Sequence, residues 1–199
     1  MKTTVIFDLS EVYLRGLKGT EEILEPLLKI PVENIKEILL HGKHTSKFFH
    51  GEVNEKEFWR SVKDEGNWNI STKKLKEAVR KNFSEIEGTR EIIEELKNKR
   101  YKMGLLSVHA KEWIDHLEKR FDYHKLFHSI LYSFEVGVSK PDKKSYQLIL
   151  EKLDAKPEEC LFIDDHEKNI AAAKELGIST IHFKNSIQLK EELRRLNLL

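Results

Sequence analysis

The sequence has little of what is typical of secreted, membrane-bound or nucleic-acid-binding proteins. Its 199 residues contain one cysteine, Cys160, so no intrachain disulfide can form and a reducing compartment is expected. The 35 basic and 34 acidic residues leave a formal net charge of +1 at pH 7, without the basic excess of nucleic-acid-binding proteins. No apolar run approaches the roughly 20 residues of a membrane span, and a strand-like run at Thr3–Phe7 leaves no room for a signal peptide. We therefore expect a cytoplasmic protein with no nucleic-acid or membrane partner.

The apolar residues that are present follow two alternating periods. Short, mostly apolar runs predict strands at Thr3–Phe7, Met103–Leu106, Ile130–Tyr132, Leu161–Ile163 and Thr180–Phe183. Longer stretches with helical spacing predict helices at Arg90–Lys99, Lys111–Arg120, Lys143–Lys152, Glu167–Leu176 and Gln188–Leu196. Strands that alternate with helices predict an α/β fold, with a Rossmann-like parallel sheet flanked by helices.

One segment interrupts this alternation. From about residue 14 to residue 84 the pattern is helical only, and the predicted helices are Thr20–Leu28, Pro31–Leu40, Asn54–Lys63 and Ser71–Phe83. We therefore predict an α/β core domain made of residues 1–13 and 85–199, with a helical domain of residues 14–84 inserted after the first strand.

Polar residues follow the predicted strands where each strand ends. Because ligands of an open parallel sheet bind at the carboxyl ends of its strands, Asp8, Ser107, Lys140 and the pair Asp164–Asp165 are expected at one cleft. Clustered carboxylates repel one another unless a cation lies among them, and a hard cation such as Mg²⁺ suits Asp8 and Asp165. A carboxylate held beside a metal and a lysine can attack phosphorus, while Ser107 and Lys140 are suited to hold the phosphoryl oxygens.

Four segments that contain these residues resemble the motifs of the haloacid dehalogenase superfamily. They are "VIFDLSEVYL", "GLLSVHA", "VGVSKPD" and "CLFIDDHEKNIAAAKELGI", and the resemblance spans essentially the whole chain. Within the superfamily the sequence is most similar to the sugar-1-phosphate phosphatases and to the phosphatase domain of epoxide hydrolases. The resemblance implies a helical cap at the insertion and Mg²⁺-dependent hydrolysis of a small phosphorylated metabolite through an aspartyl-phosphate.

The resemblance also implies a role for each matching residue. Asp8 is expected to be the catalytic nucleophile, and Ser107 and Lys140 are expected to bind the phosphate during catalysis. The expected Mg²⁺ ligands all offer oxygen atoms, and they are Asp8, the main-chain carbonyl of Ser10, Asp165 and, as a supporting or additional ligand, Asp164. Asn169 stands where many relatives have an acidic residue that orients metal-bound water.

Two residues depart from the family pattern. Ser10 stands where most phosphatases of the family have an aspartate that acts as general acid and base, which predicts slow turnover and a preference for activated phosphates. Glu11 and His109 are possible substitutes for that aspartate. Val108 stands where asparagine is usual, so only its backbone N–H is expected to contact the phosphate.

Other residues allow more than one interpretation. Arg15 and His109 are further candidates for substrate binding, and His41, His44 and His50 suggest either a substrate contact or, less well, a metal site. Phe48, Phe49, Phe58, Trp59 and Trp68 are expected to form the core of the insertion, and Cys160 is expected to be a buried apolar residue. Two alternatives to a phosphatase stay open: a 2-haloacid dehalogenase-like hydrolase, and a catalytically weakened relative that binds a phosphometabolite or a partner protein.

Overall fold

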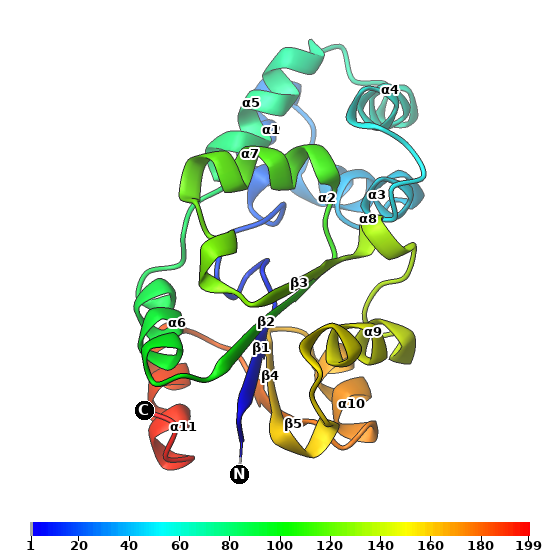
Figure 1. Cartoon of the computed structure of the whole chain (residues 1–199). Coiled ribbons are helices and arrows are strands. Elements are labelled where there is room, and N and C mark those ends of the chain that lie inside the picture. Colours follow the sequence, from blue (N-terminus) through cyan, green and yellow to red (C-terminus); the bar gives the residue numbers. More distant parts are fainter. Residues whose placement is uncertain (1) are drawn as a thin grey trace.

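The fold is described from a computed structural model, which describes residues 2–199. A single five-stranded sheet lies at its centre, with the strand order β3-β2-β1-β4-β5 (Figure 1). The strands are β1 (Thr4–Phe7), β2 (Lys102–Ser107), β3 (Ser129–Tyr132), β4 (Cys160–Asp164) and β5 (Ser179–His182). All four neighbouring pairs are parallel. The predicted α/β fold with a parallel sheet is therefore confirmed.

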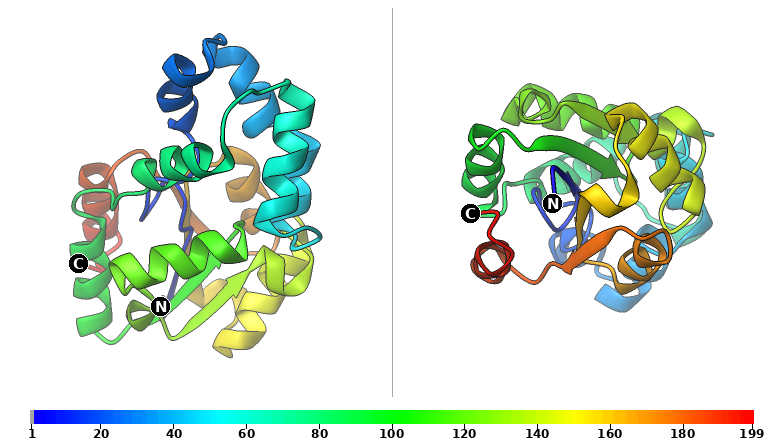
Figure 2. Two further views of the ribbon diagram at one scale, coloured as in Figure 1. Left: turned by 90° about the horizontal axis from the view of Figure 1, so that it is seen from above. Right: turned by 60° about the horizontal axis from the view of Figure 1, so that its bottom comes forward.

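Helices cover both faces of this sheet (Figure 2). Alternate strand residues explain why: Val5 and Phe7 belong to one hydrophobic cluster, and Ile6 belongs to the other. The helices α6 (Thr89–Asn98), α7 (Lys111–Phe121) and α11 (Ser186–Arg195) pack in the first cluster. The second cluster is covered by α9 (Lys143–Leu153) and α10 (Glu167–Glu175). Because both faces of the sheet are covered, successive residues of β1 and β4 are all buried, which accounts for the continuous apolar runs that predicted these strands.

The inserted residues form five helices above the carboxyl ends of the strands (Figure 1). They are α1 (Thr20–Leu28), α2 (Val32–Leu39), α3 (Lys43–Phe49), α4 (Glu55–Gly66) and α5 (Thr72–Asn82). Asn54 and Ser71 cap the N-termini of α4 and α5. The side chain of each accepts a hydrogen bond from the backbone N–H of the residue three positions later. The sequence did not predict α3, which buries only Thr45 and Phe48 and therefore has no helical apolar stripe.

The helical insertion and the α/β part share one hydrophobic core. Phe48 and Phe58 lie with ring centroids 5.1 Å and 5.8 Å from the Trp113 ring of α7. Beneath them the buried Glu55 carboxylate accepts hydrogen bonds from Trp113 Nε1 at 3.1 Å and from Lys76 Nζ at 2.5 Å. A buried carboxylate that is bonded in this way fixes the angle between the insertion and α7 better than apolar contact alone.

The two connections between these parts run side by side. Arg15 N donates to Ser84 O at 2.8 Å, and Ile86 N donates to Tyr13 O at 2.9 Å. The domain boundaries predicted from the sequence, at residues 13–14 and 84–85, fall at this crossing and remain a prediction. Three shorter helices complete the fold: η1 (His124–Leu126), α8 (Ser133–Val136) and η2 (Pro157–Glu159). Within residues 2–199, every helix is too short or too polar to cross a bilayer.

Candidate active site

The carboxyl ends of the strands bring together the residues that the sequence singled out. Asp8 directly follows β1, Ser107 is the last residue of β2, and Asp164 is the last residue of β4. Lys140 lies in the loop between α8 and α9. Because all five strands are parallel, these positions meet at the same edge of the sheet, beneath the helical insertion (Figure 1).

Lys140 is the centre of a buried ionic network. Its Nζ lies 2.7 Å from Asp8 Oδ1 and 2.7 Å from Asp164 Oδ2, and the lysine is 7% exposed. Burial alone acts to lower the pKa of Lys140, but the two carboxylates outweigh it and raise this pKa above its ordinary value. The lysine is therefore charged at neutral pH and can offset negative charge at Asp8.

The Asp8 carboxylate is held through one of its two oxygens. Oδ1 accepts hydrogen bonds from Leu9 N at 2.6 Å and from Lys140 Nζ. No donor within residues 2–199 contacts Oδ2, which leaves that oxygen available. Burial raises the pKa of Asp8, Lys140 opposes this rise, and the neighbouring Asp164 adds to it. A further cation close to Asp8 would favour its ionised form.

The neighbouring aspartates Asp164 and Asp165 have different surroundings. Asp164 is fully buried, and its oxygens accept hydrogen bonds from Lys140 Nζ, His166 N and Asn169 Nδ2 at 2.7–3.1 Å. Asp165 is half-buried and lines a cavity, and its pKa is raised by burial and by Asp164. The side-chain amide of Asn169, which stands where many relatives have an acidic residue, donates hydrogen bonds to Asp164.

Three carboxylates and one ammonium group make this site fit a divalent cation. Single carboxylate oxygens of Asp8, Asp164 and Asp165 all lie within 4.8 Å of one another, and no other group of three potential ligands occurs within residues 2–199. Oxygen ligands of this kind suit Mg²⁺. Ser10 also lines the cavity, and no donor within residues 2–199 reaches its main-chain carbonyl oxygen.

Ser107 has an unused hydroxyl group. Its side chain is 1% exposed, and Oγ has no hydrogen-bond partner within residues 2–199. A buried hydroxyl without a partner costs about 1–3 kcal/mol, so native proteins rarely keep one without a reason. An oxygen of a bound anion would supply the missing partner.

A cavity of about 940 Å³ lies between this edge of the sheet and the helical insertion. Its floor consists of residues that follow the strands, together with Lys140 of the α8–α9 loop; they include Asp8, Ser10, Val108, Lys140 and Asp165. Its wall consists mainly of residues from the insertion, which include Arg15, Lys18, Glu21, Lys36, His41 and Phe49. The sequence predicted Arg15 among them and offered His41 as a possible substrate contact. It gave no signal for the other four, because their place at the cavity depends on how the insertion docks.

The two possible substitutes for the missing aspartate differ in the structure. Glu11 lines the cavity, its backbone has a positive φ of 60°, and its Oε1 accepts a hydrogen bond from Gly16 N at 2.9 Å. His109 also lines the cavity, but its ring is buried and Nδ1 accepts a hydrogen bond from Ala110 N. Burial lowers the pKa of His109 to about 4, so this residue is neutral at pH 7 and poorly suited to act as an acid.

The three histidines of the insertion point to different places. His41 lines the cavity, His44 Nε2 lies 2.8 Å from Glu65 Oε2, and His50 Nε2 lies 3.1 Å from Ser139 Oγ. They therefore form no metal site.

The aromatic residues of the insertion and Cys160 were expected to be buried. Phe48, Phe58, Trp59 and Trp68 are buried as expected, whereas Phe49 is half-buried and lines the cavity. Cys160 is fully buried, and burial raises the pKa of its thiol to about 11, so it is an unreactive apolar residue as predicted.

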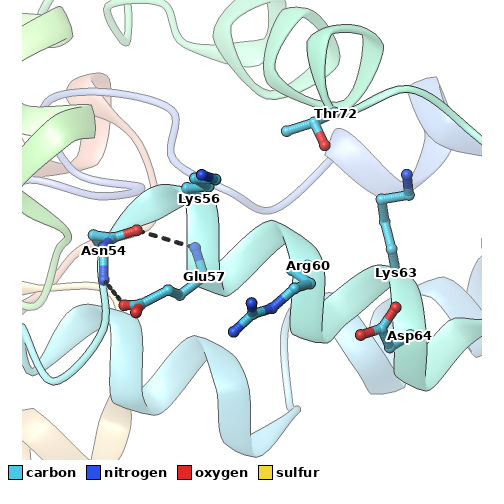
Figure 3. Close-up of a pocket in the computed structure, with 7 residues that line it drawn as sticks. All are labelled: Asn54, Lys56, Glu57, Arg60, Lys63, Asp64 and Thr72. Carbon is cyan, nitrogen blue, oxygen red and sulfur yellow. Dashed lines mark hydrogen bonds between the residues drawn. The ribbon is translucent and has the colours of Figure 1, made fainter.

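A second hollow, of about 400 Å³, lies along α4 (Figure 3). It is lined by Asn54, Lys56, Glu57, Arg60, Lys63, Asp64 and Thr72. Asn54 and Glu57 are already bonded to each other's backbone at the start of α4, as the dashed lines in Figure 3 show. None of its residues belongs to the acidic cluster, so the larger cavity is the candidate active site.

Comparison with protein families gives one match that covers most of the chain. The model of the haloacid dehalogenase-like hydrolases matches residues 6–183. A phosphorylated carbohydrates phosphatase of Thermotoga maritima is 34% identical over 115 residues, which cover 55% of this chain and 53% of that protein. A flavin mononucleotide hydrolase of Arabidopsis thaliana is 26% identical over 163 residues, which cover 80% and 66% of the two chains. The matched residues thus span about half to two thirds of these relatives.

Solved structures of similar fold cover nearly the whole chain. A HAD family enzyme of Bacteroides thetaiotaomicron, in complex with magnesium and inorganic phosphate, has a TM-score of 0.77 and 24% sequence identity. The alignment covers 93% of this chain and 96% of that enzyme. A predicted HAD-like family hydrolase from Porphyromonas gingivalis has a TM-score of 0.79 and 22% identity, over 99% and 98% of the two chains. These similarities establish the fold.

Proposed function

The chain belongs to the haloacid dehalogenase-like hydrolase family, and from this premise we propose that it is a Mg²⁺-dependent phosphatase of a small phosphorylated metabolite. One observation carries the proposal: the nucleophile candidate Asp8, the charged Lys140 and the unpartnered hydroxyl of Ser107 belong to the same sheet edge as Asp165. Relatives named as phosphatases, and a structural neighbour crystallised with magnesium and phosphate, support it.

The proposed metal ligands are the carboxylates of Asp8 and Asp165 and the main-chain carbonyl of Ser10. Asp164 lies within the same cluster, but its oxygens are bonded to other groups, so we assign it the role of holding Lys140 and supporting the site. Mg²⁺ bound there would offset the charges of the carboxylates and of the substrate phosphate.

The proposed reaction has two steps. An Asp8 carboxylate oxygen attacks phosphorus, the bond between phosphorus and the leaving oxygen breaks, and that oxygen takes the electron pair. Water then attacks the phosphorus of the aspartyl-phosphate, which releases inorganic phosphate and restores the carboxylate. Lys140 and Ser107 hold the phosphoryl oxygens in both steps, and the insertion limits the access of bulk water.

Ser10 determines the expected substrate preference. Without a general acid at this position, the leaving oxygen departs unprotonated, which lowers the rate by about 10²–10⁴-fold for poor leaving groups. We therefore expect slow turnover, with aryl, acyl or anomeric phosphates preferred to alkyl phosphates. Glu11, which lines the same cavity, is a better candidate for partial compensation than the neutral His109.

The leaving group would lie in the upper part of the cavity. The backbone N–H of Val108 is assigned to a phosphoryl oxygen, and Arg15 is assigned to a negatively charged or hydroxyl group of the substrate. His109 borders the same space and contributes shape, since its ring is neutral and buried.

Hydrolysis of p-nitrophenyl phosphate tests the proposal, because p-nitrophenolate departs without a proton. The wild type should turn over only with Mg²⁺, and Asp8→Asn should reduce the rate to background. Asp115→Asn is the matched control, since Asp115 is an exposed residue of α7 that pairs with Lys111. Full activity of Asp8→Asn, or activity without any metal, would contradict the mechanism.

An inactive but folded wild type would point to one of the other two functions. Release of halide from a 2-haloacid would then indicate a dehalogenase, with Asp8 attacking carbon. Binding of Mg²⁺ and inorganic phosphate without either reaction would indicate a binding protein. A wild type that prefers alkyl to aryl phosphates would keep the phosphatase but contradict the role given to Ser10.

A further inference from the structure

The end of α3 contacts both loops that carry phosphate-binding residues. We call this contact the seam, and its residues are Phe49, His50 and Gly51 of the insertion and Ser133, Phe134 and Ser139 of the α/β part. In Figure 1, α3 lies directly beside α8, which begins at Ser133. Ser133 Oγ donates a hydrogen bond to Phe49 O and accepts one from His109 N at 3.1 Å. The seam therefore joins the insertion to the loop that follows Ser107.

His50 forms the second hydrogen bond across the seam. Its Nδ1 lies 2.7 Å from Ser46 O, and a carbonyl oxygen can only accept, so Nδ1 carries the proton. In the neutral ring Nε2 is then an acceptor, and it lies 3.1 Å from Ser139 Oγ. The Ser139 hydroxyl thus donates to a ring whose orientation is already set within α3.

Ser139 directly precedes Lys140 and is held on two sides. Its hydroxyl is bonded to His50, and its main-chain oxygen accepts a hydrogen bond from Asp142 N at 2.9 Å. From this loop the Lys140 side chain must place Nζ 2.7 Å from both Asp8 and Asp164. A small shift of this loop would lengthen the contact of Lys140 Nζ with Asp8 or the one with Asp164.

The seam is tightly packed as well as hydrogen-bonded. Gly51 has a φ of 72°, and a Cβ added there would lie 2.9 Å from Phe134 O, so a side chain at this position would push the two parts apart. The Phe49 and His109 rings pack with their centroids 5.7 Å apart. One three-residue segment of the insertion therefore fixes both loops at once.

We propose that His50 is a positioning residue, which holds the Lys140 loop through Ser139 and makes a complete phosphate site depend on the seating of the insertion. The inference rests on the proposed phosphatase function. The function itself concerns groups that touch the phosphate, whereas His50 acts only through Ser139 and Lys140.

The test compares His50→Leu, His50→Gln, Ser139→Ala and the double variant His50→Leu/Ser139→Ala. His44→Leu is the matched control, because His44 lies in α3, the helix that His50 directly follows, and pairs with Glu65 inside the insertion. We expect His50→Leu and Ser139→Ala each to lower kcat on p-nitrophenyl phosphate by about three- to tenfold, the worth of one hydrogen bond. KM should change less than kcat, and His50→Gln should retain most of the activity. The kcat of the double variant should be no lower than that of the less active single variant, because both substitutions remove the same hydrogen bond.

Hydrogen exchange gives a second readout that does not depend on turnover. The Asp142 amide, bonded to Ser139 O, should exchange faster in His50→Leu and Ser139→Ala but not in His44→Leu. Multiplicative losses in the double variant, equal losses in His44→Leu, or unchanged exchange at residues 137–142 would each overturn the role of His50. A wild type without Mg²⁺-dependent turnover would instead overturn the proposed function, and the exchange data would still decide whether His50 holds the loop.

Discussion

The floor and the wall of the candidate active-site cavity hold their charged groups in different ways. On the floor, Asp8, Lys140 and Asp164 are each at most 7% exposed, and hydrogen bonds or ion pairs fix their charged groups. On the wall, Arg15 and Lys18 are exposed and form no ion pair within residues 2–199. Charged groups that are buried and held in place are preorganised for a reaction, whereas solvated charged side chains can move to fit a ligand. Under the proposed function, the buried floor would carry out the reaction and the exposed wall would select the substrate.

Removing the central cation of the floor should have the largest effect. Lys140→Met leaves the buried Asp8 and Asp164 unpaired, which should lower the free energy of unfolding by about 3–5 kcal/mol without added metal and abolish turnover. Lys143→Met is the control, because the Lys143–Glu175 pair has side chains 57% and 63% exposed. Urea unfolding should show a loss below about 1 kcal/mol for this control. Equal losses in the two variants would contradict the distinction between the floor and exposed charges.

The buried imidazole of His109, which lines the cavity, should make the free energy of unfolding depend on pH. The folded-state pKa of His109 is about 4, below its ordinary value of 6.5, so the unfolded chain binds this proton first. The stabilisation is complete above pH 6.5 and is lost as the pH falls toward 4, by about 3 kcal/mol in total. Urea unfolding at pH 7, 6, 5 and 4 should give a flatter profile for His109→Leu than for the wild type. Parallel profiles would show that His109 is not held neutral.

Ser107 should separate activity from stability. Under the proposed function, Ser107→Ala should lower kcat/KM by about 10–100-fold, because it removes a hydrogen-bond donor to the phosphoryl group. The free energy of unfolding should stay the same or rise by up to about 1 kcal/mol, since the hydroxyl has no partner to lose.

The matched control for Ser107 is Ser145→Ala. This buried residue donates from Oγ to Asp142 O at 2.7 Å. It should lose about 1 kcal/mol of stability and keep its activity. Thermal unfolding and p-nitrophenyl phosphate kinetics together check both variants, and a destabilised Ser107→Ala with normal kinetics would remove Ser107 from the site.

The smallest effect is expected on the wall. Arg15→Ala should raise KM by about two- to fivefold for a substrate whose leaving group carries a second negative charge, with kcat unchanged, because an exposed cation contributes little. Arg195→Ala, at an exposed arginine of α11, should change neither constant. Steady-state kinetics with p-nitrophenyl phosphate and with a doubly anionic phosphate ester measure the difference. A fall in kcat for Arg15→Ala would place this residue with the floor instead.

The floor could be predicted from the sequence, and most of the wall could not. Asp8 and Ser107 can be identified in the sequence because one directly follows and the other ends a buried apolar run. Parallel strands end at the same edge of a sheet, so such residues are expected to lie close together. Arg15 was found because it lies close to the first strand. Lys36 and Phe49 were missed because their place at the cavity depends on how the inserted helices dock, which leaves no periodic signal.

Two roles within the site needed the structure for the same reason. Asp164 and Asp165 are adjacent and chemically identical, but only Asp164 is close enough to Lys140 and Asn169 to be fully bonded. His50 and Ser139 are 89 positions apart, and neither stands in a spacing that predicts contact.

The amino-acid sequence by itself determined the parallel α/β sheet, the place of the helical insertion and the identity of the main catalytic candidates. These features depend on short-range patterns: buried runs form strands, charged stretches of helical period form helices, and strand ends collect polar groups. Only the tertiary structure decided which aspartate holds Lys140, which histidine contacts the loop that carries Lys140, and which side chains form the cavity wall. Such choices depend on contacts between distant segments, and those contacts exist only after the core has closed and fixed the distances.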